Sequence, residues 1–361
     1  MSGGPAPERD YVVFGVVDVP SRAKAPPPYA AHAALIGANA LWSGWNVGSR
    51  ALISSGTDAI VFATYREVLC ATLLCGLALA ARCGYGRCCD VALHTFDFWQ
   101  KLTRRDLLLF MTSGGCLFLF QLAFLFGVGL VSANAAGLSI LLVPLTTLVL
   151  SAALGLEQIG VPKLAGVACA CAGCALVVLV GPTAEAATEA ADDAGSGHAG
   201  SGHAGWAQGC VLLLLSGVGT SIFVLGQRPL LDRFAELDVV AGCYSVAAVV
   251  ALSALGAYKG LVRPDARLSV TPSEGLSLCL ASVLVGVLAY SLFTYANRWL
   301  PATLVTLYGI LQPLLTSLLA YTLLGETPST GTLLGGALLV LGLLLTTWAE
   351  RAAASARRVR Q

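Results

Sequence analysis

The sequence predicts an all-α, polytopic membrane protein with about ten transmembrane helices in two inverted five-helix repeats. Three observations lead to this prediction. Of the 361 residues, 57% are hydrophobic and only 11% are charged, with a mean hydropathy of +0.78, whereas a soluble domain is about 25% charged. Long apolar runs recur along the chain. The two halves of the chain also match each other at a constant spacing.

The apolar runs have the length that a membrane helix requires, roughly 20 mostly apolar residues. A β-barrel would instead show short, alternating strands. Because every backbone polar group must be bonded within the bilayer, continuous runs of this length leave helices as the spanning structure. The expected helices cover residues 31–54, 59–81, 105–127, 132–153, 162–181, 206–226, 238–258, 275–297, 301–323 and 331–349.

Hydrophilic segments divide the chain. We expect a flexible cytosolic tail at 1–28, a first five-helix repeat at 29–181, a low-complexity acidic Gly/Ala linker at 182–204, a second five-helix repeat at 205–349 and a basic cytosolic tail at 350–361. The first tail lacks the basic-then-apolar order of a signal peptide, and it contains acids, which transit peptides avoid. His198 and His203 could suggest a metal site in the linker, but two isolated histidines in a Gly/Ser-rich segment are the simpler interpretation.

The distribution of basic residues predicts the orientation. If ten helices follow a cytosolic N-terminus, 16 of the 21 Lys and Arg residues fall on the cytosolic side and 4 fall outside, with Arg66 inside a span. Cytosolic loops carry such an excess, so both termini are expected in the cytosol. The net charge of only +1 provides no basic field for nucleic acid.

The internal repeat has a constant offset of 169 residues. Chance similarity explains matching leucines but not proline, glutamate and glycine in one register. Since each half holds an odd number of spans, the second copy must be inverted in the membrane, which is typical of transporters with a site near the midplane. The matching pairs are Pro144 with Pro313, Glu157 with Glu326, Gly166 with Gly335, Gly173 with Gly342, and Leu142, Leu145, Thr147 and Leu154 with Leu311, Leu314, Thr316 and Leu323.

Several short motifs resemble a known family. They are Leu41-Trp-Ser-Gly-Trp-Asn46, Phe62-Ala-Thr-Tyr-Arg66, Ser132-Ala-Asn-Ala-Ala136 through Pro144 to Glu157, Gly181-Pro182, Trp206-Ala-Gln-Gly209 with Ser216 and Gln227, and Gln312-Pro313 to Gly325-Glu326. In order and spacing they resemble the EamA family of the drug/metabolite transporter superfamily, over about residues 31–349. Within it, the chain looks most like the plant nodulin-21-like and walls-are-thin-related transporters.

This resemblance implies ten helices in two inverted repeats and transport of small organic solutes, with amino acids and auxin-like acids among the cargoes. It implies the plasma or vacuolar membrane as the location, with a chloroplast membrane as an alternative. The cysteine- and arginine-bearing insert at 82–104 and the Gly/Ala-rich linker depart from the family pattern. The expected partners are the lipid bilayer and a small organic solute, with proton coupling and homodimer formation as open alternatives.

The charged residues inside the spans are the first candidates for the substrate pathway, because a charge in hydrocarbon is costly unless it faces a cavity or a partner. Arg66 could bind a carboxylate in bidentate fashion, or it could extend to the interface. Glu67 lies about 100° around the helix from Arg66. It could carry a coupling proton, although an ion pair with another helix is the favoured interpretation.

Uncharged polar and aromatic residues complete the expected pathway. Polar side chains of this kind either line a wet cavity or join helices by hydrogen bonds. Asn39, Trp42 and Asn46 share one face of the first helix. The other members are Gln121, Asn134, Tyr290, Tyr308 and Gln312.

Two prolines are expected within helices, since each removes a backbone hydrogen bond. Pro144 and Pro313 are therefore candidate hinges, with a purely architectural bend as the alternative. Glu157 and Glu326 are expected to have structural roles, such as capping the next helix. The glycines of the fifth and tenth helices, Gly166, Gly173, Gly335, Gly336 and Gly342, are expected to allow close helix packing.

The sequence contains no phosphate-binding loop and no metalloprotease or serine-hydrolase motif, so we expect neither an enzyme nor a cofactor or metal. The cysteines of the 82–104 insert lack the second ligand pair that a metal site needs. Secondary transport of small organic solutes is the leading hypothesis. The alternatives are a sugar-phosphate or nucleotide-sugar antiporter and, in another class, a non-transporting scaffold or an intramembrane enzyme.

Overall fold

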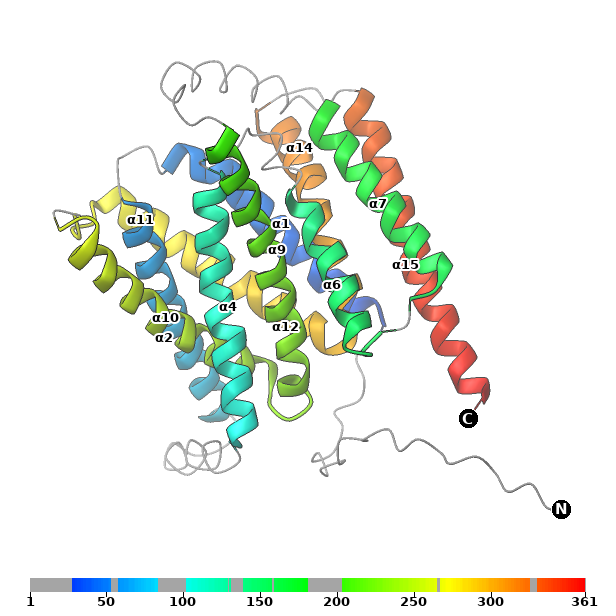
Figure 1. The fold of residues 1–361 in the computed structure, drawn as a ribbon, viewed down its shortest axis with the longest axis horizontal. Helices are drawn as coiled ribbons and strands as arrows, with labels where there is room; N and C mark the ends of the chain where they lie inside the picture. Colours follow the sequence, from blue (N-terminus) through cyan, green and yellow to red (C-terminus); the bar gives the residue numbers. More distant parts are fainter. Residues whose placement is uncertain are drawn as a thin grey trace.

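The computed structural model describes residues 28–52, 58–83, 102–128, 130, 139–157, 159–180, 203–264, 267–324 and 330–360. All regular structure in these ranges is helical (Figure 1). The expected helices are present near their expected bounds. The expected tail 1–28 lies almost wholly outside the described ranges, and so do most of the linker 182–204 and most of the 82–104 insert.

The helices of the first half are α1 (Pro28–Leu52), α2 (Ala59–Cys83), α4 (Arg104–Val128), the 3-10 turn η2 (Ser139–Leu141) with α6 (Leu142–Ala153), and α7 (Val161–Val180). The second half has α9 (His203–Leu231), α10 (Glu236–Leu261), α11 (Pro272–Leu280), the π-helix η3 (Ala281–Ala289), α12 (Tyr290–Trp299), α13 (Ala302–Leu307), the 3-10 turn η4 (Tyr308–Ile310), α14 (Leu311–Leu324) and α15 (Thr330–Arg360). Helix α15 continues through residues that we expected to form a tail.

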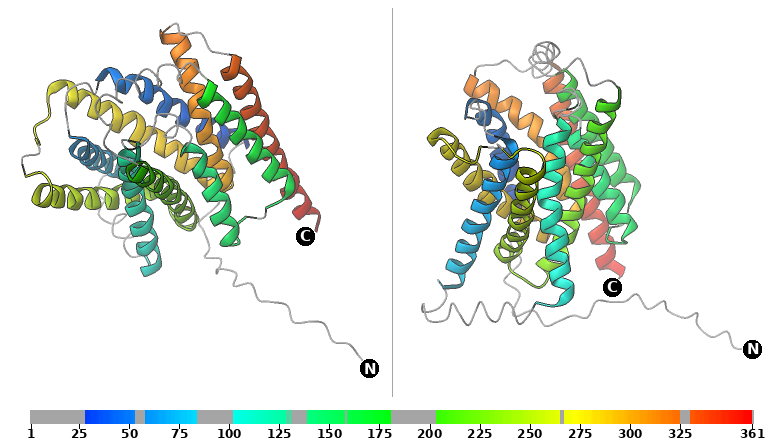
Figure 2. Two further views of the ribbon diagram at one scale, coloured as in Figure 1. Left: turned by 45° about the horizontal axis from the view of Figure 1, so that its top comes forward. Right: turned by 60° about the vertical axis from the view of Figure 1, so that its left-hand side comes forward.

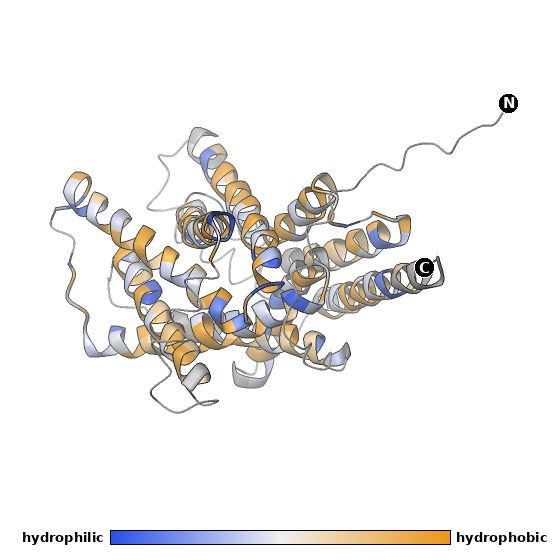
Figure 3. Cartoon of the chain, turned by 90° about the horizontal axis from the view of Figure 1, so that it is seen from below, coloured by the Kyte–Doolittle hydropathy of each residue, from blue (hydrophilic) through white to orange (hydrophobic). Residues whose placement is uncertain are grey.

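Seven helices in the described part of the chain are long and apolar enough to cross a membrane, and two apolar segments, Ser139–Ala153 and Val161–Leu176, are shorter. Helix α1 is outside both groups, since histidine, asparagine and serine interrupt its apolar residues. Seen from one end, the bundle carries apolar residues along its helices (Figure 3). The chain is thus a polytopic, helical membrane protein, and the tenfold count of spans remains a prediction.

The turns define two ends of the bundle. The α6–α7, α9–α10 and α12–α13 turns lie at the lower end of Figure 1, where α15 also finishes. The C-terminal ends of α1, α10 and α14 lie at the upper end of Figure 1. We use "lower end" and "upper end" in this sense below.

The strongest packing joins helices of the two expected halves. Helix α7 packs along α15, α4 along α9, and α2 along α10 (Figures 1 and 2). The contacts also occur in matching pairs: α9 packs on α4 and α6, while α1 packs on η3, α12 and α14. Each helix therefore buries part of its surface against the opposite half.

The glycines of α7 and α15 face each other reciprocally. A Cβ at Gly173 would lie 2.6 Å from the Gly335 oxygen, and one at Gly166 would lie 3.1 Å from the Gly342 oxygen. A Cβ at Gly342 would collide with the backbone of Ala170. These contacts confirm that the glycines allow close helix packing. In a two-fold interface, residue i of one copy contacts residue j of the other, and j contacts i. The glycine contacts have this reciprocal form.

Both prolines follow a 3-10 turn. Pro144 is the third residue of α6, directly after η2, and Pro313 is the third residue of α14, directly after η4. A proline cannot bond to the carbonyl four residues earlier, so the preceding turn tightens. The two 3-10 turns begin at residues 139 and 308, which again differ by 169.

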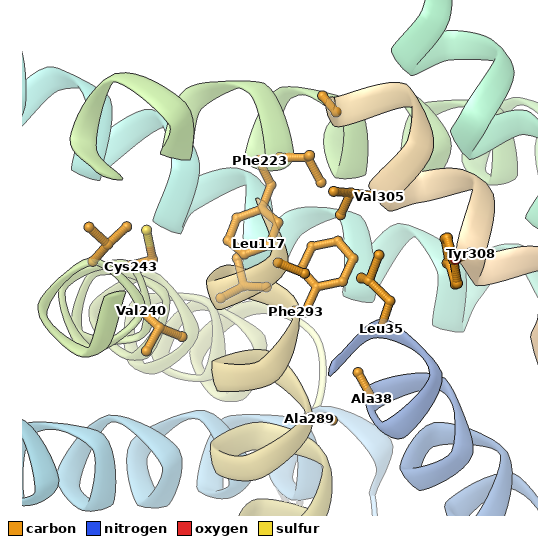
Figure 4. Close-up of a cluster of buried hydrophobic side chains, with 14 of the residues drawn as sticks. Leu35, Ala38, Leu117, Phe223, Val240, Cys243, Ala289, Phe293, Val305 and Tyr308 are labelled. Atoms are coloured by element: carbon orange, nitrogen blue, oxygen red, sulfur yellow. The ribbon is translucent and has the colours of Figure 1, made fainter. Parts of the chain in front are cut away.

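The buried core lies where the two halves meet. It draws side chains from α1, α4, α9, α10, α12, α13 and η4, and Leu117, Phe223 and Phe293 gather at its centre (Figure 4). Apolar side chains that face outward, such as Val161, Leu333 and Trp348, are exposed. This distribution suits a bundle surrounded by lipid.

Candidate functional site: an ion pair within an aromatic cluster

The adjacent charged residues Arg66 and Glu67 form an ion pair within α2. The Arg66 Nη2 atom lies 2.6 Å from Glu67 Oε1, and Nε lies 3.3 Å from the same oxygen. The Glu67 side chain is fully buried, whereas that of Arg66 is 21% exposed. Our expectation that Glu67 pairs with another helix is therefore wrong, because the long arginine side chain bends around the helix to its neighbour.

The pair lies well inside the span. Arg66 is six residues beyond Ile60, where the span begins, or about 9 Å along the helix axis. Extension to the interface is not what the structure shows, since the guanidinium is bonded to Glu67. A charge at this depth needs compensation, and the neighbouring carboxylate provides it.

Both bonds from Arg66 go to Oε1 of Glu67, so the other carboxylate oxygen, Oε2, is not bonded to Arg66. Glu67 Oε2 is buried and has no hydrogen-bond partner among the described residues. The amide of Gln121, on α4, lies close enough to interact with the Glu67 carboxylate. An acceptor that is buried without a partner is costly, so it indicates a group that the free protein does not supply.

Five aromatic residues surround this region. The Tyr290 ring lies 5.4 Å from Trp42 and 5.4 Å from Tyr244, while Phe293 lies 5.6 Å from Trp42 and Phe223 lies 6.0 Å from Tyr290. These spacings are those of interacting aromatic pairs. Tyr244 and Tyr290 lie within electrostatic range of Arg66. Helices α1, α9, α10 and α12 thus contribute one aromatic cluster next to the ion pair.

A π-helix precedes Tyr290. Helix η3 packs on α2, and the Cys70 thiol donates to the Ser282 carbonyl across this contact, at 3.7 Å. Gly286 lies against the Cys70 sulfur, where a side chain would not fit. π-Helical segments often occur at functional sites. This one sets the rotation of Tyr290 about its helix.

Other expected pathway residues bind one another instead. Gln312 donates to Asn39 Oδ1 at 3.2 Å, and Asn39 donates to the Leu35 carbonyl at 2.7 Å. Asn39 is fully buried. Tyr308 pairs with His32 at 2.9 Å. These contacts join α1 to α14 and η4.

Three expected residues have no described side chain. Asn46 lies in α1, but its side chain is outside the described part of the structure. Asn134 and Glu326 lie outside the described residues altogether. Their expected roles therefore stay predictions.

Glu157 is bonded at the lower end both to α7, the helix that follows it, and to α13. It accepts hydrogen bonds from the Thr303 amide at 3.2 Å and hydroxyl at 2.7 Å, and it pairs with Lys163. Burial alone would raise the pKa of Glu157, but the bonds from Lys163 and Thr303 outweigh it and hold the pKa below its ordinary value. The expected capping role is realised on α13, far away in sequence.

Sequence reasoning missed two features. The first is the contribution of Phe223, Tyr244 and Phe293, which are ordinary apolar-run residues with no motif around them. The second is a hydroxyl cluster beside Pro144, where Ser221 lies 2.7 Å from Thr146 and 2.9 Å from Thr147. Recurrence of Thr147 as Thr316 was a signal for the second feature.

Fold and site together define a multi-pass, helical membrane protein with a charged pair inside its spans. Residues 207–348 match the model of the EamA-like transporter family. An "uncharacterized transporter" of Archaeoglobus fulgidus is 29% identical over 140 residues, which cover 38% of this chain and 47% of that protein. The match thus spans about half of that relative. A solved structure described as "Crystal structure of protein" has a similar fold, with a TM-score of 0.65 and 19% identity over 89% of this chain and 99% of that one.

Proposed function

We propose that this chain is a secondary transporter that moves small organic solutes by alternating access, with Arg66 and Glu67 as the binding pair. The observation that carries the proposal is the buried ion pair, whose Glu67 Oε2 has no partner among the described residues and whose arginine is still partly exposed. The names of both sequence matches are those of transporters, and the fold agrees with this interpretation.

The charge balance of the pair favours a particular cargo. Arg66 and Glu67 neutralise each other, so a purely anionic solute would find no excess positive charge. A zwitterion can offer its carboxylate to the guanidinium and its ammonium group to Glu67 Oε2, which forms two charge-assisted bonds. Amino acids therefore suit the pair better than auxin-like acids, and the aromatic cluster suits an apolar or aromatic side chain.

Alternating access is supported by the repeat. The reciprocal glycine contacts of α7 and α15, the paired 3-10 turns and the matching helix contacts all follow the 169-residue offset. Two inverted copies that share a site near the midplane can exchange conformations. This argument also supports the ten-span arrangement, with residues 29–181 and 205–349 as the two repeats. The excess of Lys and Arg on one side supports the proposal that both termini lie in the cytosol.

Glu67 is also the proposed site of proton coupling. Protonation would remove the charge of Glu67 and weaken its bond to a substrate ammonium group, so that a proton and the substrate compete for Glu67. Transport would then depend on a proton gradient, and Glu67→Gln would abolish that dependence.

A sugar-phosphate or nucleotide-sugar antiporter is the second candidate. Phosphate would need several free cations. Arg66 is neutralised by Glu67, and Arg298 is paired with Glu236 at 2.9 Å, so this candidate has less support. A scaffold or an intramembrane enzyme has less support still, since both sequence matches bear transporter names.

The test is uptake by proteoliposomes that contain the purified protein. Labelled amino acids, indole acids and sugar phosphates are compared with and without a pH gradient, for wild type, Arg66→Ala and the control Arg298→Ala. We expect amino acid uptake that is lost in Arg66→Ala and kept in Arg298→Ala. Sugar-phosphate exchange alone would favour the second candidate, and uptake that survives Arg66→Ala would contradict the assigned site.

A further inference from the structure

Glu157 and Thr303 join the two expected halves at the lower end of the bundle. Glu157 lies in the turn between α6 and α7, and Thr303 lies in the first turn of α13. Both donor groups of Thr303 bond to this one carboxylate. The contact therefore rests on two hydrogen bonds to one carboxylate, and the acceptor is charged.

Lys163 extends this contact to a third element. Its ammonium group lies between Glu157 and Glu350, with the Glu350 Oε1 atom 2.6 Å away on α15. The side chains of Lys163 and Glu157 are only 5% and 6% exposed. Lys163 thus pairs with two carboxylates, and Arg228 of α9 lies within electrostatic range of both. Breaking a buried ion pair is strongly unfavourable.

Among the residues that the structure describes at the upper end, the ionic contacts between the halves are weaker. Asp58, before α2, accepts a hydrogen bond from Tyr258 of α10 at 2.8 Å. Its contact with Arg263 is 3.5 Å long, and that arginine is 61% exposed. An exposed pair of this kind contributes little.

The repeat makes the difference between the ends more specific. At the offset of 169 residues, Lys163 corresponds to Thr332, Glu350 to Gly181 and Thr303 to Asn134, while Glu157 corresponds to Glu326. An inverted repeat places equivalent positions at opposite ends. The acid thus recurs, but the lysine and the second acid do not.

We propose that Glu157, Lys163, Glu350 and Thr303 form an ionic latch that closes the lower end, and that the repeat does not duplicate it at the upper end, because the positions equivalent to Lys163 and Glu350 carry no charge. The inference rests on the proposed alternating access. The protein without substrate therefore rests with its lower end closed, and a substrate must supply the free energy that opens the latch. The latch makes the two repeats unequal although their helices match.

Hydrogen–deuterium exchange of the full-length protein in nanodiscs, without substrate, tests the latch. The variant Glu157→Gln removes a negative charge from the latch, and Lys163→Met removes its positive charge. We expect exchange in residues 302–307, at the lower end, to rise about tenfold, and exchange in residues 258–264, at the upper end, to fall. The opposite changes at the two ends are the diagnostic result, since local loosening would affect the lower end alone.

Glu236→Gln is the matched control, because it removes an ion pair between two elements of the second half, with Arg298. We expect no change at the upper end in this variant. Faster exchange at the lower end without any change at the upper end, in both latch variants, would overturn the proposal, as would no change at either end. Because the measurement needs no cargo, its result does not depend on whether the transport assay detects uptake.

Discussion

Gln121 and Tyr290 lie 169 residues apart and both lie near the Arg66–Glu67 pair. Equivalent positions of the two halves thus converge on one ion pair, Gln121 from α4 and Tyr290 from α12. This convergence is what a shared site between two inverted copies requires. The amide and the phenol differ in chemistry, so the two halves contribute different groups to that site.

We expect the ring of Tyr290 to contribute more to the apparent KM for uptake than its hydroxyl does. The ring contacts Trp42 and Tyr244 edge to face, and such pairs contribute about 0.5–1.5 kcal/mol each beyond buried area. We expect Tyr290→Leu to raise the apparent KM for uptake about tenfold, while Tyr290→Phe changes it less than about threefold. Tyr65→Phe, at the upper end, is the control. Equal effects of the Phe and Leu variants would assign the role to the hydroxyl.

Close packing of α7 and α15 predicts that small substitutions there are harmful. A Cβ at Gly173 or Gly342 meets backbone atoms, which cannot move aside as a flexible side chain can. We expect Gly173→Ala and Gly342→Ala to lower the free energy of unfolding by about 1–3 kcal/mol each. Gly76→Ala, which meets nothing within 4 Å, should be neutral or slightly stabilising. Thermal unfolding in detergent measures the difference, and equal melting temperatures of all three variants would refute the packing argument.

Glu157 predicts a defined response to acid. Its pKa is lowered in the folded protein, so its contribution to stability is fully present above the unfolded value of about 4.3 and is lost as the pH falls through the folded value. We expect the wild type to unfold at a higher temperature than Glu157→Gln at neutral pH. The gap should shrink as the pH falls below about 4.3. A gap that stays constant down to strongly acid pH would contradict the assigned ionisation of Glu157.

The helices of the described region followed directly from the sequence. Apolar runs and the 169-residue offset predicted their positions because both depend on local composition and on repetition. The 3-10 turns before Pro144 and Pro313 were not predicted, although the missing amide of proline accounts for them. The π-helix η3 had no such signal, since its residues are ordinary apolar ones.

The site was predicted only in part. Charged residues inside spans are rare, which is why Arg66 and Glu67 stood out in the sequence. The partners of Arg66 and Glu67 depend on how far the side chains extend and on which helices pack together. Neither can be predicted from the neighbouring residues in the sequence. Asn39 and Gln312 are bonded to each other, and their expected place in the substrate pathway stays a prediction. Tyr244 and Phe223 did not stand out in the sequence, although both are buried in the aromatic cluster.

The most direct test of the central claim compares two solutes that differ by one amine, phenylalanine and 3-phenylpropionate. Initial uptake rates are measured in proteoliposomes for wild type and Glu67→Gln. If Arg66 binds the carboxylate and Glu67 binds the ammonium group, wild type prefers phenylalanine, and Glu67→Gln lowers that preference at least about tenfold by favouring the anion. An unchanged preference in a folded variant would show that the Arg66–Glu67 pair does not select the substrate.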